Sequence, residues 1–145
     1  MSLSHVLTSK NIHGTKAFAT MVGERWKGAV QVVWSVAAPI TEATDRYDDG
    51  LLSFDQVSQP LLEGLETCLE LGVGFGGQND TCGVPPCVLN DDPRFVTSIE
   101  DAHRDAERDF FFPEVCTECT MRTRCRGVRK GYVERFGTQG LHPQK

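Results

Sequence analysis

The sequence predicts an α/β fold, a partial parallel sheet with helices packed on it, followed by an irregular cysteine-rich C-terminal extension. Three observations support this prediction. Residues 30–39 form a nearly continuous apolar and β-branched run, which is typical of a strand covered on both faces of a parallel sheet. A β-prone segment and a helical segment precede this run, so the three together form a βαβ unit. Cysteines then gather at short spacings near the C-terminus, in a region without regular periodicity.

The first βαβ unit is predicted from local patterns. Residues 5–8 are β-prone and predict the first strand. Thr15 is a plausible N-cap for the helix that follows, and Gly28 is expected to end it. The apolar face of this helix repeats every four residues and consists of Phe18, Val22 and Trp26. The crossover to the strand at residues 30–39 is expected to be right-handed.

A second helix is predicted after an Asp-rich loop at residues 41–50. Ser53 and Gln56 form a possible capping box. Pro60 would remove a hydrogen bond from a helix interior, so the helix has two possible starts: at this box, or near Ser58 with Pro60 in the first turn. Gly72 is placed to end the helix, and residues 73–76 then form a short third strand. The apolar stripe of this helix consists of Leu61, Leu65 and Leu69.

The chain divides into two parts at residue 77. Residues 1–77 are the partial βα portion, and residues 78–145 are the cysteine-rich extension, which is predicted to bind a metal cluster. Within the extension, residues 78–113 read as loop and turn segments. A short terminal helix is predicted from Val128, Tyr132 and Phe136, which are spaced by four residues and followed by Gly137.

Chain length and cysteine content limit the classes of protein to which this chain can belong. A chain of 145 residues can bury a core without cross-links. No secretory signal is visible at the N-terminus, and no apolar run is long enough to span a membrane. We therefore expect a cytoplasmic protein with no membrane association. In that reducing compartment the six cysteines are not expected to form disulfides, and their clustering favours metal binding.

The charge distribution is uneven. Residues 116–145 carry 7 basic and 2 acidic side chains, whereas residues 1–115 carry 8 basic and 18 acidic ones. A basic tail could contact nucleic acid, but this one holds few aromatic residues to stack on bases. Anionic thiolates and sulfides would also attract nearby Arg and Lys. We therefore do not expect a nucleic-acid partner.

The cysteines give the most specific signal. Cys116, Cys119 and Cys125 follow the pattern Cys-x2-Cys-x5-Cys, and the two-residue gap is common to zinc and iron–sulfur sites. The longer step to Cys125 favours an iron–sulfur cluster. Both kinds of site need a fourth ligand. Cys87 is the first choice because two prolines hold the preceding backbone extended, and Cys82 is the substitute.

Other residues whose side chains could bind a ligand or take part in catalysis are interpreted as structural. Cys68 lies on the apolar stripe of the second helix and is predicted to be a core residue. Gly72, Gly74 and Gly77 match the dinucleotide-binding spacing, but they follow a helix, whereas a pyrophosphate site needs strand, glycine turn and helix in that order. The four histidines are scattered and are each expected to be surface residues, and the acidic run at residues 101–109 is interpreted as a solvated face. No catalytic residue is assigned.

The run from Cys116 to Cys125, followed by Gly127, Tyr132 and Gly137, resembles the C-terminal ending of many radical SAM enzymes. It is similar to the auxiliary-cluster extensions called twitch and SPASM. The likeness extends more loosely over residues 3–137, which resemble the last strands of that family's partial TIM-type barrel. The resemblance implies that Cys87, Cys116, Cys119 and Cys125 ligate one auxiliary [4Fe–4S] cluster.

The family's catalytic signature does not occur in this sequence. Radical SAM enzymes bind their catalytic cluster through Cys-x3-Cys-x2-Cys, and neither this triplet nor a Gly-Gly-Glu segment for SAM is present. The resemblance therefore implies the C-terminal half of a radical SAM oxidoreductase, not catalytic alone and dependent on a separate chain for the N-terminal half. The alternative function is a zinc-stabilised, non-catalytic interaction module that uses the same cysteines.

Overall fold

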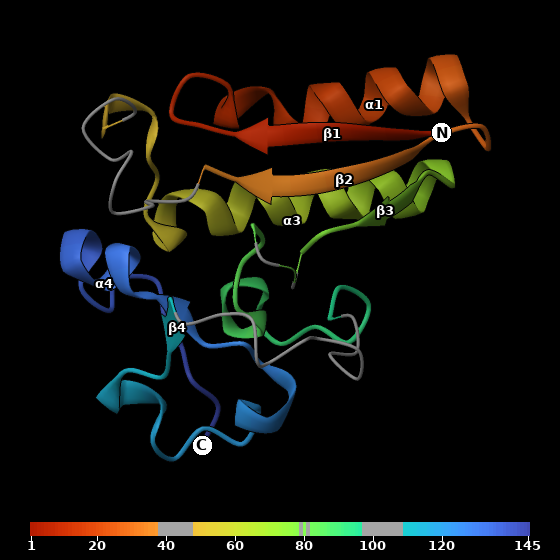
Figure 1. Cartoon of the computed structure of the whole chain (residues 1–145). Helices are drawn as coiled ribbons and strands as arrows, with labels where there is room; N and C mark the ends of the chain where they lie inside the picture. The colour runs from red at the N-terminus through yellow and green to blue at the C-terminus, as the bar shows by residue number, and fades with distance from the viewer. Residues whose placement is uncertain (38–47, 79, 81, 97–108) are drawn as a thin grey trace.

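The computed structural model describes residues 1–37, 48–78, 80, 82–96 and 109–145 and has an α/β architecture (Figure 1). The helices and strands are β1 (Ser2–Leu7), α1 (Thr15–Trp26), β2 (Gln31–Val36), α3 (Phe54–Leu71), β3 (Gly74–Gly76), β4 (Phe110–Phe111), β5 (Val128–Arg129) and α4 (Lys130–Phe136). Short 3₁₀ helices connect them at η1 (Ile12–Gly14), η2 (Asp48–Gly50), η3 (Pro86–Leu89), η5 (Glu114–Cys116) and η6 (Arg122–Arg124). The predicted α/β class with a parallel sheet is thereby confirmed.

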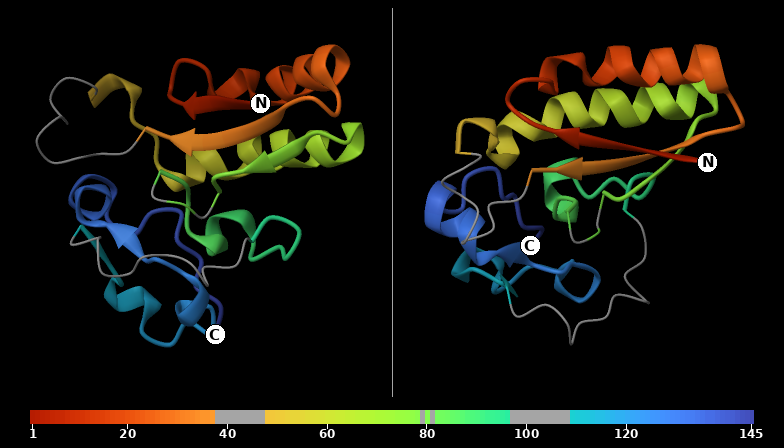
Figure 2. Two further views of the ribbon diagram at one scale, coloured as in Figure 1. Left: turned by 45° about the vertical axis from the view of Figure 1, so that its right-hand side comes forward. Right: turned by 45° about the horizontal axis from the view of Figure 1, so that its top comes forward.

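The main sheet is parallel, with the strand order β1-β2-β3 in the described part of the chain. Ser2 is aligned with Gln31 across the first pair, and Gln31 is aligned with Gly74 across the second. Helices α1 and α3 lie side by side on one face of this sheet (Figure 2). Because the strands are parallel, their carboxyl ends lie at one edge of the sheet, on the side where α4 lies (Figure 1).

The burial of β2 differs from the prediction for residues 30–39. Val32, Trp34 and Val36 are buried beneath the helices, whereas Val33 and Ser35, on the opposite face, are only half-buried. A strand covered on both faces was therefore the wrong interpretation, because β-branched residues also favour a strand that is covered on one face. The strand is also shorter than predicted, and residues 38 and 39 lie outside the described residues.

The N-terminus of α1 differs from the predicted cap. Gly14 is the N-cap, and Thr15 is the first residue of the helix. The Thr15 side chain is fully buried, and its hydroxyl donates a hydrogen bond of 2.6 Å to the carbonyl oxygen of Ile12. Trp26, predicted on the apolar face, is 39% exposed because it lies at the end of the helix.

Helix α3 begins with the predicted capping box. The Ser53 backbone N–H donates to Oε1 of Gln56 over 2.9 Å. The helix starts at Phe54, so the later start near Ser58 was wrong, and Pro60 lies inside the helix. Gly72 ends it in the left-handed conformation with a φ of 67°, as predicted. Leu69, predicted on the apolar stripe, is 44% exposed.

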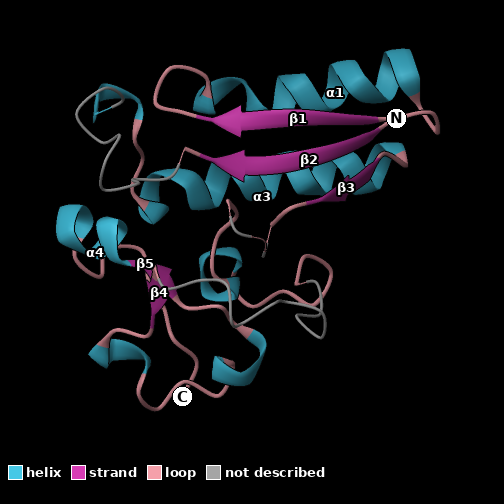
Figure 3. Cartoon of the chain, viewed as in Figure 1, coloured by secondary structure: helices cyan, strands magenta, loops and turns pink. Residues whose placement is uncertain are grey.

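The extension contains a small antiparallel pair that the sequence did not reveal. Strands β4 and β5 pair through Phe110 with Arg129 and Phe111 with Val128. Val128 therefore belongs to a strand, and the terminal helix starts at Lys130 instead of including it. Loops and short 3₁₀ helices make up most of the remaining extension (Figure 3). None of the helices in the described part of the chain has the length and apolar character needed to cross a bilayer.

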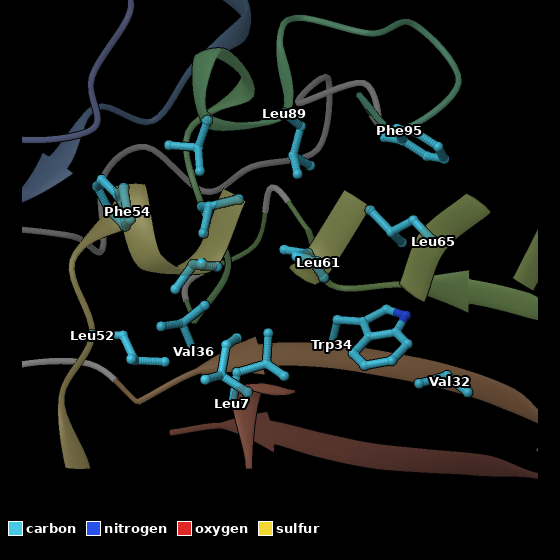
Figure 4. Packing of buried hydrophobic residues seen from close by; sticks show 14 of the residues in the cluster. Leu7, Val32, Trp34, Val36, Leu52, Phe54, Leu61, Leu65, Leu89 and Phe95 are labelled. Carbon is cyan, nitrogen blue, oxygen red and sulfur yellow. The ribbon is translucent and has the colours of Figure 1, made fainter. Parts of the chain in front are cut away.

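One hydrophobic core joins the sheet to the extension. Leu61 and Leu65 of α3 lie between Trp34 of β2 and the side chains of Leu89 and Phe95 (Figure 4). Further along the chain, Val128, Tyr132 and Leu141 belong to the same buried cluster. The extension is therefore packed against the sheet layer and is held in a defined position relative to it.

Candidate metal centre

Four of the six cysteines line one pocket in the extension. Cys87, Cys116, Cys119 and Cys125 all border it, although the whole of residues 88–115 separates the first from the second. The pocket contains about 350 Å³ of space, part of it open to solvent. The folded chain thus brings together the four thiols that the sequence singled out, including the first choice for the fourth position.

Cys87 reaches the pocket from the short 3₁₀ helix η3. Pro85 has extended backbone before this helix, and its carbonyl oxygen accepts a hydrogen bond of 3.0 Å from the N–H of Val88. Asn90 and Asp91 then have positive φ values of 57° and 52°, which end the helix and reverse the chain. The Cys87 side chain is only 9% exposed. A rigid proline-bounded turn thus fixes this thiol.

The other three thiols are positioned by consecutive turns. The N–H of Cys116 donates to the carbonyl oxygen of Pro113 over 2.8 Å, and the N–H of Cys119 donates to the carbonyl oxygen of Cys116 over 3.1 Å. This tight turn places the first two sulfurs on the same side of the chain. After η6, Cys125 returns to extended backbone and points its thiol into the same pocket.

Backbone amides point at two of the sulfurs. The N–H of Gly127 donates to Sγ of Cys125 over 3.3 Å. A backbone hydrogen bond from His142 reaches the Cys87 thiol and acts to lower its pKa. Such N–H donors stabilise thiolate ligands and help set the reduction potential of a cluster. The pocket therefore offers part of the environment that a metal-bound thiolate needs.

Burial favours the protonated form of three of these thiols in the metal-free chain. It raises the pKa of Cys87 to about 12 and the pKa of Cys125 to about 11. Burial also raises the pKa of Cys116, and the nearby Cys119 adds to the effect. A bound cation would replace these protons, because only the thiolate is a ligand.

The four thiols share a pocket, but their side chains do not form a metal-ligand arrangement. Within the described ranges, no three or more His, Cys, Asp or Glu side chains are arranged to hold a metal ion. A single zinc ion requires all four sulfurs about 2.3 Å from one centre. An iron–sulfur cubane instead binds each thiolate through a different iron atom, so its thiolates stand further apart. Among the described residues, the four thiols border one pocket but are not arranged as either kind of site.

Cys82 and Cys68 lie outside this pocket. Cys82, the predicted substitute ligand, is exposed and borders a different cavity. Cys68 lies on α3 and is fully buried. Burial raises its pKa to about 11, which agrees with the predicted core role. His5 was expected at the surface, but it is half-buried and stacks on Phe18 of α1 with ring centroids 3.9 Å apart.

Sequence reasoning missed Asp91 at this site. Its side chain borders the cysteine pocket, and burial raises the pKa of its carboxyl group, with the Gln144 side chain acting in the opposite direction. The sequence placed Asp91 in an ordinary turn, because residues 90–93 have typical turn composition. No local signal shows that the positive φ at Asp91 belongs to a turn beside four thiols.

Comparisons with models of known protein families, with curated proteins and with solved structures found no match to this chain.

Proposed function

We propose that this chain is an iron–sulfur protein in which Cys87, Cys116, Cys119 and Cys125 bind one [4Fe–4S] cluster. The observation that carries the proposal is the position of Cys87. It comes from a separate turn, far from the other three cysteines in sequence, and still borders the same pocket. Four thiols are the complete ligand set of such a cluster.

The chain's own residues would hold and shield the cluster. Phe112, Met121 and Leu141 border the pocket and would limit the access of water. The Arg122 side chain also borders it and would offset negative charge, while its guanidinium lies 4.8 Å from the ring centroid of Phe112. When bound, the cluster would supply one-electron redox chemistry.

The wider role that we propose follows the sequence resemblance. The chain would correspond to the auxiliary-cluster part of a radical SAM oxidoreductase, with a separate chain or segment supplying the SAM-binding half. In support, β1 is an edge strand of a three-stranded parallel sheet within the described residues. Val6 on this strand is 47% exposed. An open parallel edge of this kind can be extended by further strands.

Metal analysis of protein prepared without oxygen tests the proposal. We expect about four iron atoms and four sulfide ions per chain, and an absorption band at about 400 nm that bleaches on reduction. One zinc per chain without sulfide would contradict the proposal and support the zinc-stabilised, non-catalytic interaction module instead. A chain with neither metal after reconstitution with iron and sulfide would contradict both functions.

A further inference from the structure

The last residues of the sequence run along the cysteine pocket. Leu141 and Pro143 both border this pocket, and the backbone N–H of His142, between them, donates a hydrogen bond to the Cys87 thiol. We call residues 142–145 the strap, and Figure 1 shows the marked end of the chain among the loops of the extension. Cys87 itself is only 9% exposed. The strap therefore supplies part of the cover that buries this thiol.

One end of the strap starts from a fixed point. Leu141, directly before the strap, is 7% exposed and belongs to the hydrophobic core. Just upstream, the carbonyl oxygen of Gln139 accepts a hydrogen bond of 2.6 Å from the Tyr132 hydroxyl. Gly140 has a φ of 77°, and a Cβ at this position would overlap the backbone nitrogen of Asp55. The chain is thus anchored beside the start of α3 before it crosses the pocket.

The other end of the strap is attached more weakly. The carbonyl oxygen of Gln144 accepts a hydrogen bond of 2.9 Å from the N–H of Thr120. The Gln144 side chain acts to lower the pKa of the Asp91 carboxyl group, although the Asp91 oxygens have no hydrogen bond of standard geometry within the described residues. The charged atoms of Lys145 and Glu118 lie 3.8 Å apart, and both side chains are at least 75% exposed, so this ion pair contributes little.

This difference between the two ends favours local opening. His142, Gln144 and Lys145 are exposed, whereas Leu141 is buried. Release of the Gln144 end breaks its hydrogen bond with Thr120 but leaves Leu141 in the core. Segments with few buried apolar contacts open at a lower free-energy cost than the core around them. Opening of the strap therefore costs less than unfolding of the extension.

We propose that the strap closes the cysteine pocket, and that its opening controls the access of metal ions and thiol reagents to Cys87. The contacts of the strap do not depend on which metal the pocket holds, whereas its role in metal exchange rests on the function proposed above. Opening would remove Pro143 from the pocket wall and the His142 N–H from the Cys87 sulfur. The Cys87 thiol would then be open to solvent.

The rate at which N-ethylmaleimide labels Cys87 tests this closure. The protein would be used as isolated without oxygen, and labelling of each cysteine would be followed at low extent by mass spectrometry of its peptide. A bound metal blocks the thiolate, so the label reports metal release in loaded protein and strap opening in metal-free protein. Cys82, which is exposed, is the reference for the reagent, and Cys68, which is fully buried, reports unfolding.

Deletion of residues 143–145 removes the weakly attached end and keeps the Leu141 anchor. We expect the deletion to increase the Cys87 labelling rate about tenfold or more, with Cys82 and Cys68 labelled as in the wild type. The control is Lys145→Gln, which removes only the exposed ion pair and should leave all three rates unchanged. An unchanged Cys87 rate in the deletion variant would overturn the proposal, whatever metal the protein holds. Metal analysis of the same samples tests the proposed function separately.

Amide hydrogen exchange of the wild type decides the matter if the deletion also accelerates labelling of Cys68. Opening of the strap breaks the hydrogen bonds of the Thr120 and His142 N–H groups together, so both amides should have the same protection factor. The N–H of Val73 donates to the carbonyl oxygen of Cys68 over 2.8 Å and should be protected far more strongly. Different protection factors for Thr120 and His142 would overturn the proposal, as would protection of both equal to that of Val73.

Discussion

Cys87 and Cys82 are close in sequence, but they border different cavities, and this separates their expected roles. Cys87→Ala should remove one of four cluster ligands and abolish or strongly reduce bound iron and sulfide. Cys82→Ala should leave both at the wild-type level. The measurement is the iron and sulfide content of the two variants, prepared side by side without oxygen.

Cys82→Ala also serves as the matched control, since both substitutions remove one thiol from the same loop region. If Cys82→Ala loses more iron than Cys87→Ala, the choice of the fourth ligand is wrong. The sequence predicted this choice from the two prolines before Cys87 alone. The structure adds a second reason for choosing Cys87, because its thiol is buried in the turn between Pro85 and Asn90.

Gly127 is the residue of the site whose lack of a side chain matters most. Its φ is 87°, and a Cβ at this position would overlap the carbonyl oxygen of Phe111 on β4. Gly127→Ala should therefore combine backbone strain with a steric overlap and reduce the free energy of unfolding by about 1–3 kcal/mol or more. It should also disturb the N–H donor to Cys125 and weaken cluster binding.

Gly137 is a suitable control for this substitution. It also has a positive φ, 60°, but no atom lies within 4 Å of the position of its Cβ. Gly137→Ala should show the cost of the backbone conformation alone, about 1–3 kcal/mol, because a φ of 60° with a ψ of −134° strongly favours glycine. Urea unfolding of both variants measures the difference. Equal losses would show that the approach of Phe111 to Gly127 is unimportant.

Among the elements, the Tyr132 phenol of α4 is hydrogen-bonded to the start of α3. The Tyr132 hydroxyl accepts a hydrogen bond of 2.8 Å from the N–H of Phe54 and donates one of 2.6 Å to the carbonyl oxygen of Gln139. Tyr132→Phe keeps the stacked ring but leaves both backbone groups without this partner. We expect the free energy of unfolding to fall by about 1–3 kcal/mol. No loss in urea unfolding would contradict this role.

The same phenol should make the free energy of unfolding decrease at high pH. Burial raises the pKa of Tyr132 to about 12, above its ordinary value of 10.0. The folded state therefore favours the protonated phenol, and this contribution is complete below pH 10 and is lost as pH rises towards 12. Unfolding free energies measured across this range should fall more steeply for the wild type than for Tyr132→Phe. Parallel curves would show that Tyr132 does not titrate in this way.

Local signals predicted some elements correctly and long-range contacts decided the others. The capping box at Ser53 and the helix end at Gly72 depend on residues within one turn, so the sequence predicted both. The β4–β5 pair depends on contacts between Phe111 and Val128, which are far apart in sequence. Pro60 was overestimated as a helix breaker, because the buried face of α3 keeps it helical.

The candidate site shows the same division. The Cys-x2-Cys-x5-Cys spacing is visible in the sequence because a single loop carries it. Asp91, Arg126 and Arg129 gave no such signal. Arg126 and Arg129 read as part of a general basic tail, and only the packing of the extension against the end of the sheet places them in one cavity.

At the scale of the whole molecule, metal binding should stabilise the extension more than the sheet. The sheet layer contains the 18-residue helix α3, whereas the extension relies on two-residue strands and the 7-residue α4. The four thiols connect η3 to the turns around residues 116–125. Removing the metal should therefore increase amide exchange in residues 113–127 far more than in β2. Uniform acceleration over both regions would show that the chain responds as one unit.

The central claim is that four cysteines hold one iron–sulfur cluster. The most direct test is the mass of the folded chain, prepared without oxygen and measured under non-denaturing conditions. The account predicts an added mass equal to four iron and four sulfide, and its loss in Cys87→Ala. An added mass equal to one zinc ion would contradict the claim, as would a chain that carries no added mass after reconstitution with iron and sulfide.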